Sequence, residues 1–397
     1  MLSVSPIPRY RPQSGPAILA AGFRPFFLAS GLWAAVAVPL WLAMFAGRAD
    51  VQTMLAAQVW HVHEMVFGFG AATVAGFLLT AIPNWTGRLP LQGASLAGLV
   101  LTWCAGRAAV LFSGSVGAAA ATLIDLAFPV AFLAVVAREI AAGRNWRNLP
   151  MVAALSLLLI ANSLVHAEAM GVASTADLGN RLGVGTLLML ISLVGGRIIP
   201  SFTANWLAKQ RPEVPAPGTF GGFDRLALAL TAVALLGWVA APESRAGAWV
   251  DLAAAMALAV RLARWRGWAA WREPLLWILH VGYAWLPVGL LLLGASILWP
   301  VLPQTTALHA LTAGAIGTMT LAVMTRASLG HTGRPLTAGA ATTAIYVLVT
   351  VAAVARILAP LAGADYFAAL SAAGAAWTSA FGLFVIAYAR PLTAPRT

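Results

Sequence analysis

The chain has 397 residues, of which 61% are hydrophobic and only 9% are charged, and its formal net charge is +12. So little charge and so much apolar surface exclude an ordinary soluble domain and predict an all-α polytopic membrane protein. A transmembrane β-barrel would show short alternating segments instead of runs of about twenty apolar residues. The positive charge does not indicate nucleic-acid binding, because the basic residues lie mostly between apolar runs.

Twelve apolar runs are long enough to cross a membrane. No soluble domain fits between them, so residues 1–397 are predicted to form a single transmembrane domain. The longest connection, 209–223, is rich in proline and glycine and is predicted to be an exposed loop. No convincing internal repeat is visible. The predicted spans are 24–46, 59–82, 91–112, 115–137, 149–171, 182–204, 224–241, 247–263, 274–299, 306–327, 337–360 and 367–389.

The basic residues predict the orientation of these spans. Most of them, Arg261 among them, lie in the terminal segments and in the connections that follow even-numbered spans. The connections after odd-numbered spans hold only Arg48, Arg181, Arg245 and Arg356. By the positive-inside rule, both termini are therefore predicted to be cytoplasmic, which also favours an even number of spans.

Histidines are the main candidates for chemistry. The stretch Trp60-His61-Val62-His63-Glu64-Met65 stands at the head of the second span, where ionisable side chains are costly unless they have a function. Neutral imidazole is a common ligand of haem iron and copper, so all six histidines are candidate metal ligands. For any single one, a helix–helix hydrogen bond explains it equally well. The orientation puts four near the outer ends of spans and two on the inner side: His61, His63, His166 and His309, and His280 and His331.

Helical geometry separates the two histidines of the second span. Residues two apart differ by about 200° around a helix, so His61 and His63 are not expected to face one metal ion. His61 is predicted to share its face with Glu64. His63 is predicted to share its face with Gly70, and this small residue leaves room for a flat ligand such as a porphyrin.

Arginines within apolar runs form a second set of candidates. Arg24, Arg197 and Arg326 are candidate cofactor-binding residues, with snorkelling to headgroups as the alternative for Arg24 and Arg326. Arg197 is expected to be buried, next to a break of its helix at Pro200. Its partner could be Asp125, a haem propionate or an anionic substrate. Arg107 is expected to form a structural ion pair with Asp125.

Several stretches together resemble the NnrS family of membrane proteins. They are GFRPFF at 22–27, WHVHEMVFG at 60–68, AGFLLTAIPNWTGR at 75–88, GGRIIPSFT at 195–203 and HALTAGAIGTMTLAVMTRASLGHTGR at 309–334. The resemblance covers roughly the first 335 residues. It implies a haem- and copper-containing protein of the bacterial cytoplasmic membrane, linked to nitric oxide, denitrification and protection against nitrosative stress. His166 and His280 lie outside the matching stretches and are nominated by physical reasoning alone.

The leading interpretation is a protein that binds nitric oxide, or turns it over, at a buried site containing haem b and copper. The single cysteine, Cys104, excludes covalent c-type haem. Glu64 is the candidate catalytic acid for delivering protons. The pattern leaves open whether the protein is a nitric oxide-metabolising oxidoreductase or a sensor without turnover, and which histidine binds which metal. Its partners would be nitric oxide, the lipid bilayer and an unknown electron donor, with no nucleic acid. The alternative is a twelve-span solute transporter.

Overall fold

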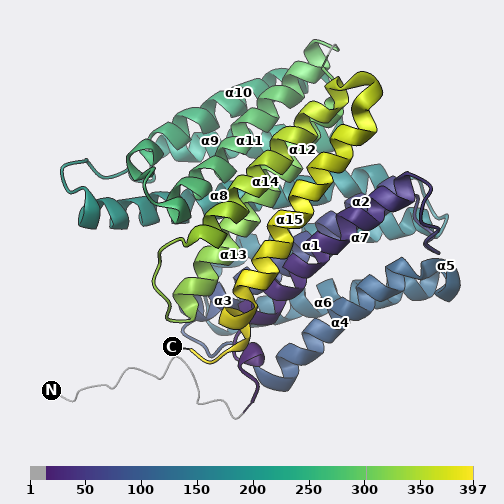
Figure 1. Cartoon of the computed structure of the whole chain (residues 1–397), viewed down its shortest axis with the longest axis horizontal. Helices are drawn as coiled ribbons and strands as arrows, with labels where there is room; N and C mark the ends of the chain where they lie inside the picture. The colour runs from purple at the N-terminus through teal and green to yellow at the C-terminus, as the bar shows by residue number, and fades with distance from the viewer. Residues whose placement is uncertain (1–14, 301, 397) are drawn as a thin grey trace.

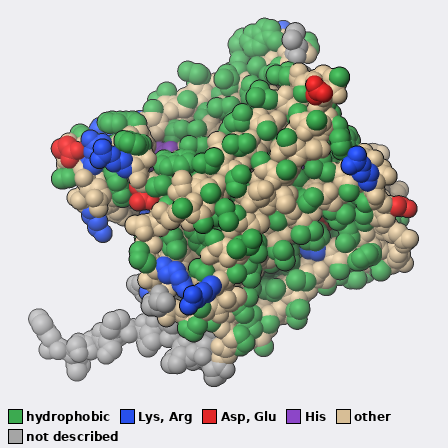
Figure 2. Space-filling model, viewed as in Figure 1, with side chains coloured by type: hydrophobic (Ala, Val, Ile, Leu, Met, Phe, Trp, Pro, Cys, Tyr) green, Lys and Arg blue, Asp and Glu red, His purple; other side chains and the backbone are tan. Residues whose placement is uncertain are grey.

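The computed structural model describes residues 15–300 and 302–396, and all regular elements in this part of the chain are helices (Figure 1). Twelve helical stretches of the described residues are long and apolar enough to cross a membrane. The predicted all-α polytopic architecture is therefore confirmed. Figure 2 shows a face covered by hydrophobic side chains, with charged side chains near its edges, as expected for a surface in contact with lipid.

The spans follow one another with short connections. Spans 1 to 6 are α1 (Phe23–Phe45), then α2 (Ala57–His63), η2 (Glu64–Gly70) and α3 (Ala71–Thr86), then α4 (Gly93–Leu111), α6 (Ala118–Ala142), η3 (Trp146–Asn148) with α7 (Leu149–Ala169), and α8 (Ala176–Gln210). Spans 7 to 12 are α9 (Gly222–Ala240), α10 (Arg245–Ala263), α11 (Pro274–Leu298), then α12 (Gln304–His309), η5 (Ala310–Gly317) and α13 (Thr318–His331), then α14 (Ala340–Leu358) and α15 (Tyr366–Thr393). Short connecting helices are η1 (Ala17–Leu19), α5 (Ser113–Val116), η4 (Gly267–Ala270), η6 (Ala359–Leu361) and η7 (Gly363–Asp365).

The predicted break in the sixth span is wrong. Helix α8 runs past both predicted ends of this span and continues through Pro200. Proline is tolerated inside a membrane helix when neighbouring helices satisfy the freed backbone groups. Transporters often bind their substrates at broken membrane helices, and the sixth span does not supply such a break.

The helices pack in a pattern that repeats three times. Spans 3–6 form one group, spans 7–10 form a second, and spans 11, 12, 1 and 2 form a third, with each span packed against the next. The third group closes because α15 packs against α1, as Figure 1 shows for the yellow and purple helices. The last spans of the three groups, spans 2, 6 and 10, meet at the centre. Their most apolar windows are 61–67% buried, compared with 50% or less for the other spans.

Two of the central spans also share an unusual local structure. In span 2 the π-helical segment η2 begins directly after His63, and in span 10 the π-helical segment η5 begins directly after His309. The stretches 63–88 and 309–334 share the initial histidine, a glycine at the sixth position and a final Thr-Gly-Arg. The chain therefore contains an internal repeat, and π-helical segments of this kind occur frequently at functional sites.

Both ends of the described chain lie on one face of the molecule, which we call the near face. Arg24 at the start of α1 donates hydrogen bonds to the carbonyl oxygens of Leu392 and Ala394, at 3.0 and 2.6 Å. Because successive spans reverse direction, even-numbered spans begin at the opposite, far face. The cytoplasmic location of the near face remains a prediction.

Candidate metal centre

Six polar side chains form a buried cluster in the far half of the molecule, which we call the histidine cluster. They come from the beginnings of spans 2 and 4 and the ends of spans 3 and 5, which meet at the same depth. Each residue is at most 5% exposed. The members are His63, Glu64, Arg107, Asp125, Asn162 and His166.

One guanidinium joins the two carboxylates of this cluster. Nη1 of Arg107 donates to Oε2 of Glu64 at 2.6 Å, and its Nη2 donates to Oδ1 of Asp125. The indole Nε1 of Trp33 also donates to Oε2 of Glu64, at 2.7 Å. The predicted ion pair between Arg107 and Asp125 is confirmed, but it is part of a larger network that extends to span 2.

Two glycines make room for these contacts. A Cβ atom on Gly68 would lie within 3 Å of Glu64 Oε2, Arg107 Nη1 and Trp33 Nε1 at once. A Cβ atom on Gly106 would lie 2.7 Å from Oδ1 of Asp125. Glycine at these two positions therefore lets the charged groups of the cluster lie against the helix backbone.

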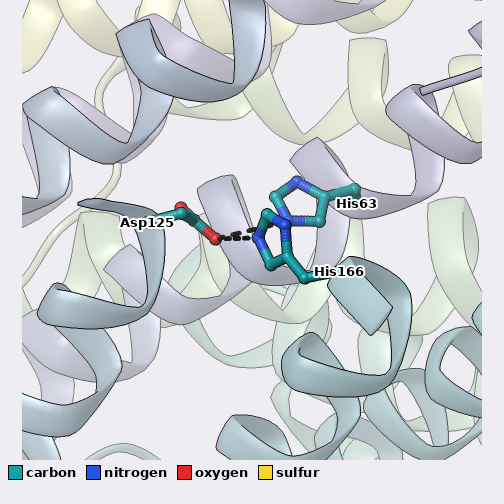
Figure 3. A group of neighbouring side chains, drawn as sticks. All are labelled: His63, Asp125 and His166. Carbon is teal, nitrogen blue, oxygen red and sulfur yellow. Dashed lines mark hydrogen bonds and ion pairs between the residues drawn. The ribbon is translucent and has the colours of Figure 1, made fainter. Parts of the chain in front are cut away.

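Two imidazole rings converge on the other oxygen of Asp125 (Figure 3). Nε2 of His166 lies 2.9 Å from Oδ2 of Asp125, and Nε2 of His63 lies 3.4 Å from the same oxygen. The ring centroids are 5.2 Å apart and the rings are nearly perpendicular. One ligand atom from each of the three residues lies within 4.8 Å of the other two. Two imidazole nitrogens and one carboxylate oxygen form a donor set that suits copper(II) or zinc.

Hydrogen bonding indicates the charge of the cluster without a metal ion. Nδ1 of His63 faces Oε1 of Glu64 at 2.9 Å, and its Nε2 faces Oδ1 of Asn162 at 2.9 Å. The Asn162 amide is oriented by its own donation to Asp125 Oδ2 at 2.8 Å. Both ring nitrogens of His63 therefore face acceptors, as an imidazolium requires. With Arg107, two cations then balance two carboxylates, which is the arrangement that a buried ionic group needs.

His61 and His309 form a second pair in the far half. The His61 ring stacks on Trp41 at 4.1 Å, and among the described residues nothing hydrogen-bonds to its buried Nδ1. Nδ1 of His309 donates to the carbonyl oxygen of Thr305 at 2.7 Å, which leaves its Nε2 available. Arg356 acts electrostatically on both histidines, and His61 also acts on His309. Backbone donation of this kind is typical of metal-ligating histidines.

The remaining two histidines lie in the near half. Nδ1 of His280 donates to the carbonyl oxygen of Leu276 at 3.1 Å, and its Nε2 is 3.5 Å from the hydroxyl of Thr203. The ring of His331 packs against Phe23 at 5.5 Å. In the described part of the chain, no contact joins either ring to the other four histidines. The structure therefore brings the six predicted ligands together as two pairs and two single residues.

Glu64 differs from its predicted placement. Its carboxylate bonds to Nδ1 of His63 and to Arg107, so it belongs to the His63 side and not to the face of His61. The prediction assumed an α-helix, whereas η2 begins at Glu64. The wider π-helical turn changes which side chains face one another.

The predicted arginines have three different surroundings. Arg24 is buried and binds the backbone at the end of α15, and the guanidinium of Arg326 lies 4.2 Å from the ring centroid of Phe202. Arg197 is exposed on α8, so the expectation that its guanidinium is buried is wrong. Asp125 is not its partner, because Asp125 binds Arg107 at the far end of the bundle.

A second ionic cluster was missed by the sequence reasoning, and we call it the arginine cluster. Arg261, which was assigned to a connection, is only 1% exposed inside α10. Its Nε donates to Asp224 Oδ1 at 3.1 Å, and its Nη1 donates to Tyr283 Oη at 2.9 Å and to the carbonyl oxygen of Ser192 at 3.1 Å. Arg264 donates to the other oxygen of Asp224, at 3.1 Å. The cluster ties spans 6, 7, 8 and 9 together.

Comparison with protein families agrees with the sequence motifs. Residues 17–396 match the NnrS protein family, which is nearly the whole chain. The chain belongs to the NnrS family. The match includes spans 11 and 12, where the individual motifs were weakest. No curated protein matches the chain. Family membership suggests metal binding, and His63, Asp125 and His166 form a group that can hold a metal ion.

Proposed function

We propose that this NnrS-family protein binds nitric oxide at a haem b and copper site in the bacterial cytoplasmic membrane, in nitrosative-stress protection or denitrification. The observation that carries the proposal is the division of the four far-half histidines into two pairs, each with its own charged partner. Two different metal groups would need two such sites.

We assign copper to the histidine cluster. His63, His166 and Asp125 supply nitrogen and oxygen donors that already converge, and a copper ion would replace the hydrogen bonds between them. Asn162 and Thr122 would remain to orient the ligands, since the Thr122 hydroxyl lies 3.2 Å from Nδ1 of His166. Partners behind the ligands fix ring orientation and raise metal affinity.

We assign haem b to the His61–His309 pair. Arg356 acts electrostatically on both rings, its buried Nη1 makes no hydrogen bond to the described residues, and a haem propionate would satisfy it. His309, which is oriented by its bond to Thr305, and His61, whose buried Nδ1 has no partner among the described residues, would be the residues that hold the haem. When bound, ferrous haem supplies an iron atom that binds nitric oxide. Arg24, Arg197 and Arg326 lie in the near half, so Arg356 is the better placed cation.

Glu64 is proposed as the group that holds and moves a proton beside the copper ligands. Its Oε1 faces Nδ1 of His63, and its Oε2 is held by Arg107 and Trp33. If nitric oxide is reduced, protons must reach the site, and buried carboxylates serve such relays. Glu64→Gln keeps the shape and removes the exchangeable charge. Unchanged steady-state consumption of nitric oxide in this variant would remove Glu64 from the role.

The proposal is tested by titrating the dithionite-reduced, purified protein with nitric oxide while recording its optical spectrum. We expect a b-type haem spectrum that shifts on nitric oxide addition. We expect His309→Ala to lose the haem and the matched variant His280→Ala to retain it. A colourless, metal-free protein from cells supplied with ample haem and copper would contradict the proposal and favour a transporter.

A further inference from the structure

A cavity of about 90 Å³ lies where the three central spans meet. Its walls come mainly from the middle thirds of spans 2, 6 and 10, and the residues that matter below are Gly70, Leu187, Val194, Ile316 and Val323. The cavity is therefore at mid-membrane depth between the three central spans, and it is partly open, since Val194 and Val323 in its wall are only half-buried.

The lining of this cavity does not suit water. Its hydroxyl groups belong to Thr73 and Thr320, and both are used within the protein. Thr73 bonds to Ser30 at 2.6 Å and to the carbonyl oxygen of Phe69 at 3.2 Å, and Thr320 donates to the carbonyl oxygen of Gly317 at 2.8 Å. A buried water molecule needs two to four free polar partners. Engineered apolar cavities of about 150 Å³ stay dry and take up benzene or xenon.

Larger ligands do not suit it either. The wall, as the described residues form it, contains no histidine, no charged residue and no free hydrogen-bond donor. A haem would need an axial ligand and a cation for its propionates, and a quinone would need a donor for its carbonyl oxygens. Gly70 is in the cavity wall, but the room for a porphyrin that its size predicted is absent, because Leu187 packs against it and a Cβ on Gly70 would lie 2.9 Å from Leu187 Cδ1.

Both π-helical segments lead from a candidate metal ligand to this cavity. Segment η2 starts after His63 and ends at Gly70, which is in the cavity wall. Segment η5 starts after His309 and contains Ile316, which is also in the wall. At about 1.5 Å per residue, each segment covers on the order of 10 Å. The cavity is thus within a short distance of both histidine pairs.

We propose that this central cavity is a docking site for an uncharged diatomic gas, which in this protein is nitric oxide. The choice of gas rests on the proposed function. Size, dryness and depth argue for such a ligand, because an apolar gas dissolves in the bilayer and can enter a mid-membrane cavity without desolvation. From there it reaches either metal site along η2 or η5.

Xenon and nitric oxide together test this proposal. Crystals of the purified holoprotein are pressurised with xenon, and the xenon is located by its anomalous scattering. Val194→Phe and Val323→Phe place a ring in the cavity, and Val347→Phe, at a valine that is 52% exposed on α14, is the matched control. We expect xenon in the cavity of the unchanged protein and of the control, and none in the two filled variants. We also expect both filled variants to bind nitric oxide about fivefold more slowly or worse, with unchanged haem and copper content.

The results that would overturn the docking site differ from those that would overturn the proposed function. A cavity without xenon in the unchanged protein, or filled variants that bind nitric oxide at the normal rate, would overturn the docking site while leaving the proposed function intact. Xenon in the cavity of a protein that binds no nitric oxide would instead overturn the proposed function, and with it the choice of gas.

Discussion

The histidine cluster and the arginine cluster are both buried ionic networks, but they differ in the ratio of arginines to carboxylates. In the histidine cluster one arginine serves two carboxylates, and of their two remaining oxygens Oδ2 of Asp125 faces two imidazoles. In the arginine cluster two arginines serve one aspartate. Imidazoles can exchange a proton for a metal ion, whereas arginine remains a cation in proteins.

This difference indicates that the arginine cluster links helices, whereas the histidine cluster can bind a metal ion. The hydrogen bonds that Arg261 donates go to a carboxylate, a backbone carbonyl and Tyr283, and Gly196 packs directly against its guanidinium. The histidine cluster instead keeps three donor atoms in a group small enough for one ion. Both clusters carry the cost of burying charge. The arginine cluster uses its charges to link helices, whereas the histidine cluster can exchange its protons for a metal ion.

The largest effect is expected from Arg107→Ala. It leaves Glu64 and Asp125 buried without their shared cation, and breaking a buried pair in this way costs about 3–5 kcal/mol. We expect poor folding, measured as the yield of monodisperse protein in detergent and its thermal midpoint. Arg261→Ala should cost less, because Arg264 still binds Asp224. Equal losses in the two variants would remove the distinction between the clusters.

Asp125→Asn should next reduce copper binding, with a smaller cost to the fold than Arg107→Ala because Arg107 keeps its bond to Glu64. Asparagine preserves the shape and the hydrogen bond to Asn162 but removes the negative oxygen that faces both imidazoles. Because changes even behind metal ligands lower affinity by about 10–100-fold, loss of a ligand charge should lower it by about a hundredfold or more. Copper competition titration measures this, and Asp224→Asn is the matched control. Normal affinity in Asp125→Asn would place the metal elsewhere.

Gly196→Ala should destabilise the arginine cluster without affecting metals. The added Cβ would collide with the Arg261 guanidinium, and overpacking of this kind costs about 1–3 kcal/mol. We expect a lower thermal midpoint together with unchanged haem and copper content. Gly237→Ala, where a Cβ meets open space, is the control. Loss of metal in Gly196→Ala would show that the arginine cluster supports the metal sites.

The smallest effect is expected from Arg264→Ala. Its guanidinium is 34% exposed, and Asp224 keeps its bond to Arg261, so the loss should be below about 1 kcal/mol. A change in thermal midpoint as large as that of Arg107→Ala would mean that Arg264, and not Arg261, holds Asp224.

The all-α architecture with twelve spans could be predicted from the sequence because apolar runs of membrane length are local signals, and the orientation that the arginines indicate stays a prediction. The Arg107–Asp125 pair was also predictable, since a membrane arginine has few partners. The exposure of Arg197 and the burial of Arg261 were not, because they depend on which side of a helix meets its neighbours. The predicted face of Glu64 was wrong because no local sequence pattern indicates the π-helical turn that begins there.

The sequence does contain one local signal of the two central spans, an internal repeat. The stretches 63–88 and 309–334 align without a gap, from the initial histidine to the final Thr-Gly-Arg. This repeat would have marked His63 and His309 as equivalent positions on two central spans, and would have separated them from His280 and His331. The roles of Asn162 and Trp33 had no such signal, because asparagine and tryptophan occur in many membrane helices that bind no metal.

The most direct test of the central claim is copper(II) electron paramagnetic resonance of the purified protein, with metal analysis of the same sample. The account predicts about one bound copper per chain whose spectrum carries the nitrogen couplings of two imidazoles. His166→Ala should lose one of these couplings or the copper itself, and His280→Ala should change neither. A protein without copper, or a spectrum that His166→Ala leaves unchanged, would contradict the assignment of the histidine cluster as the metal centre.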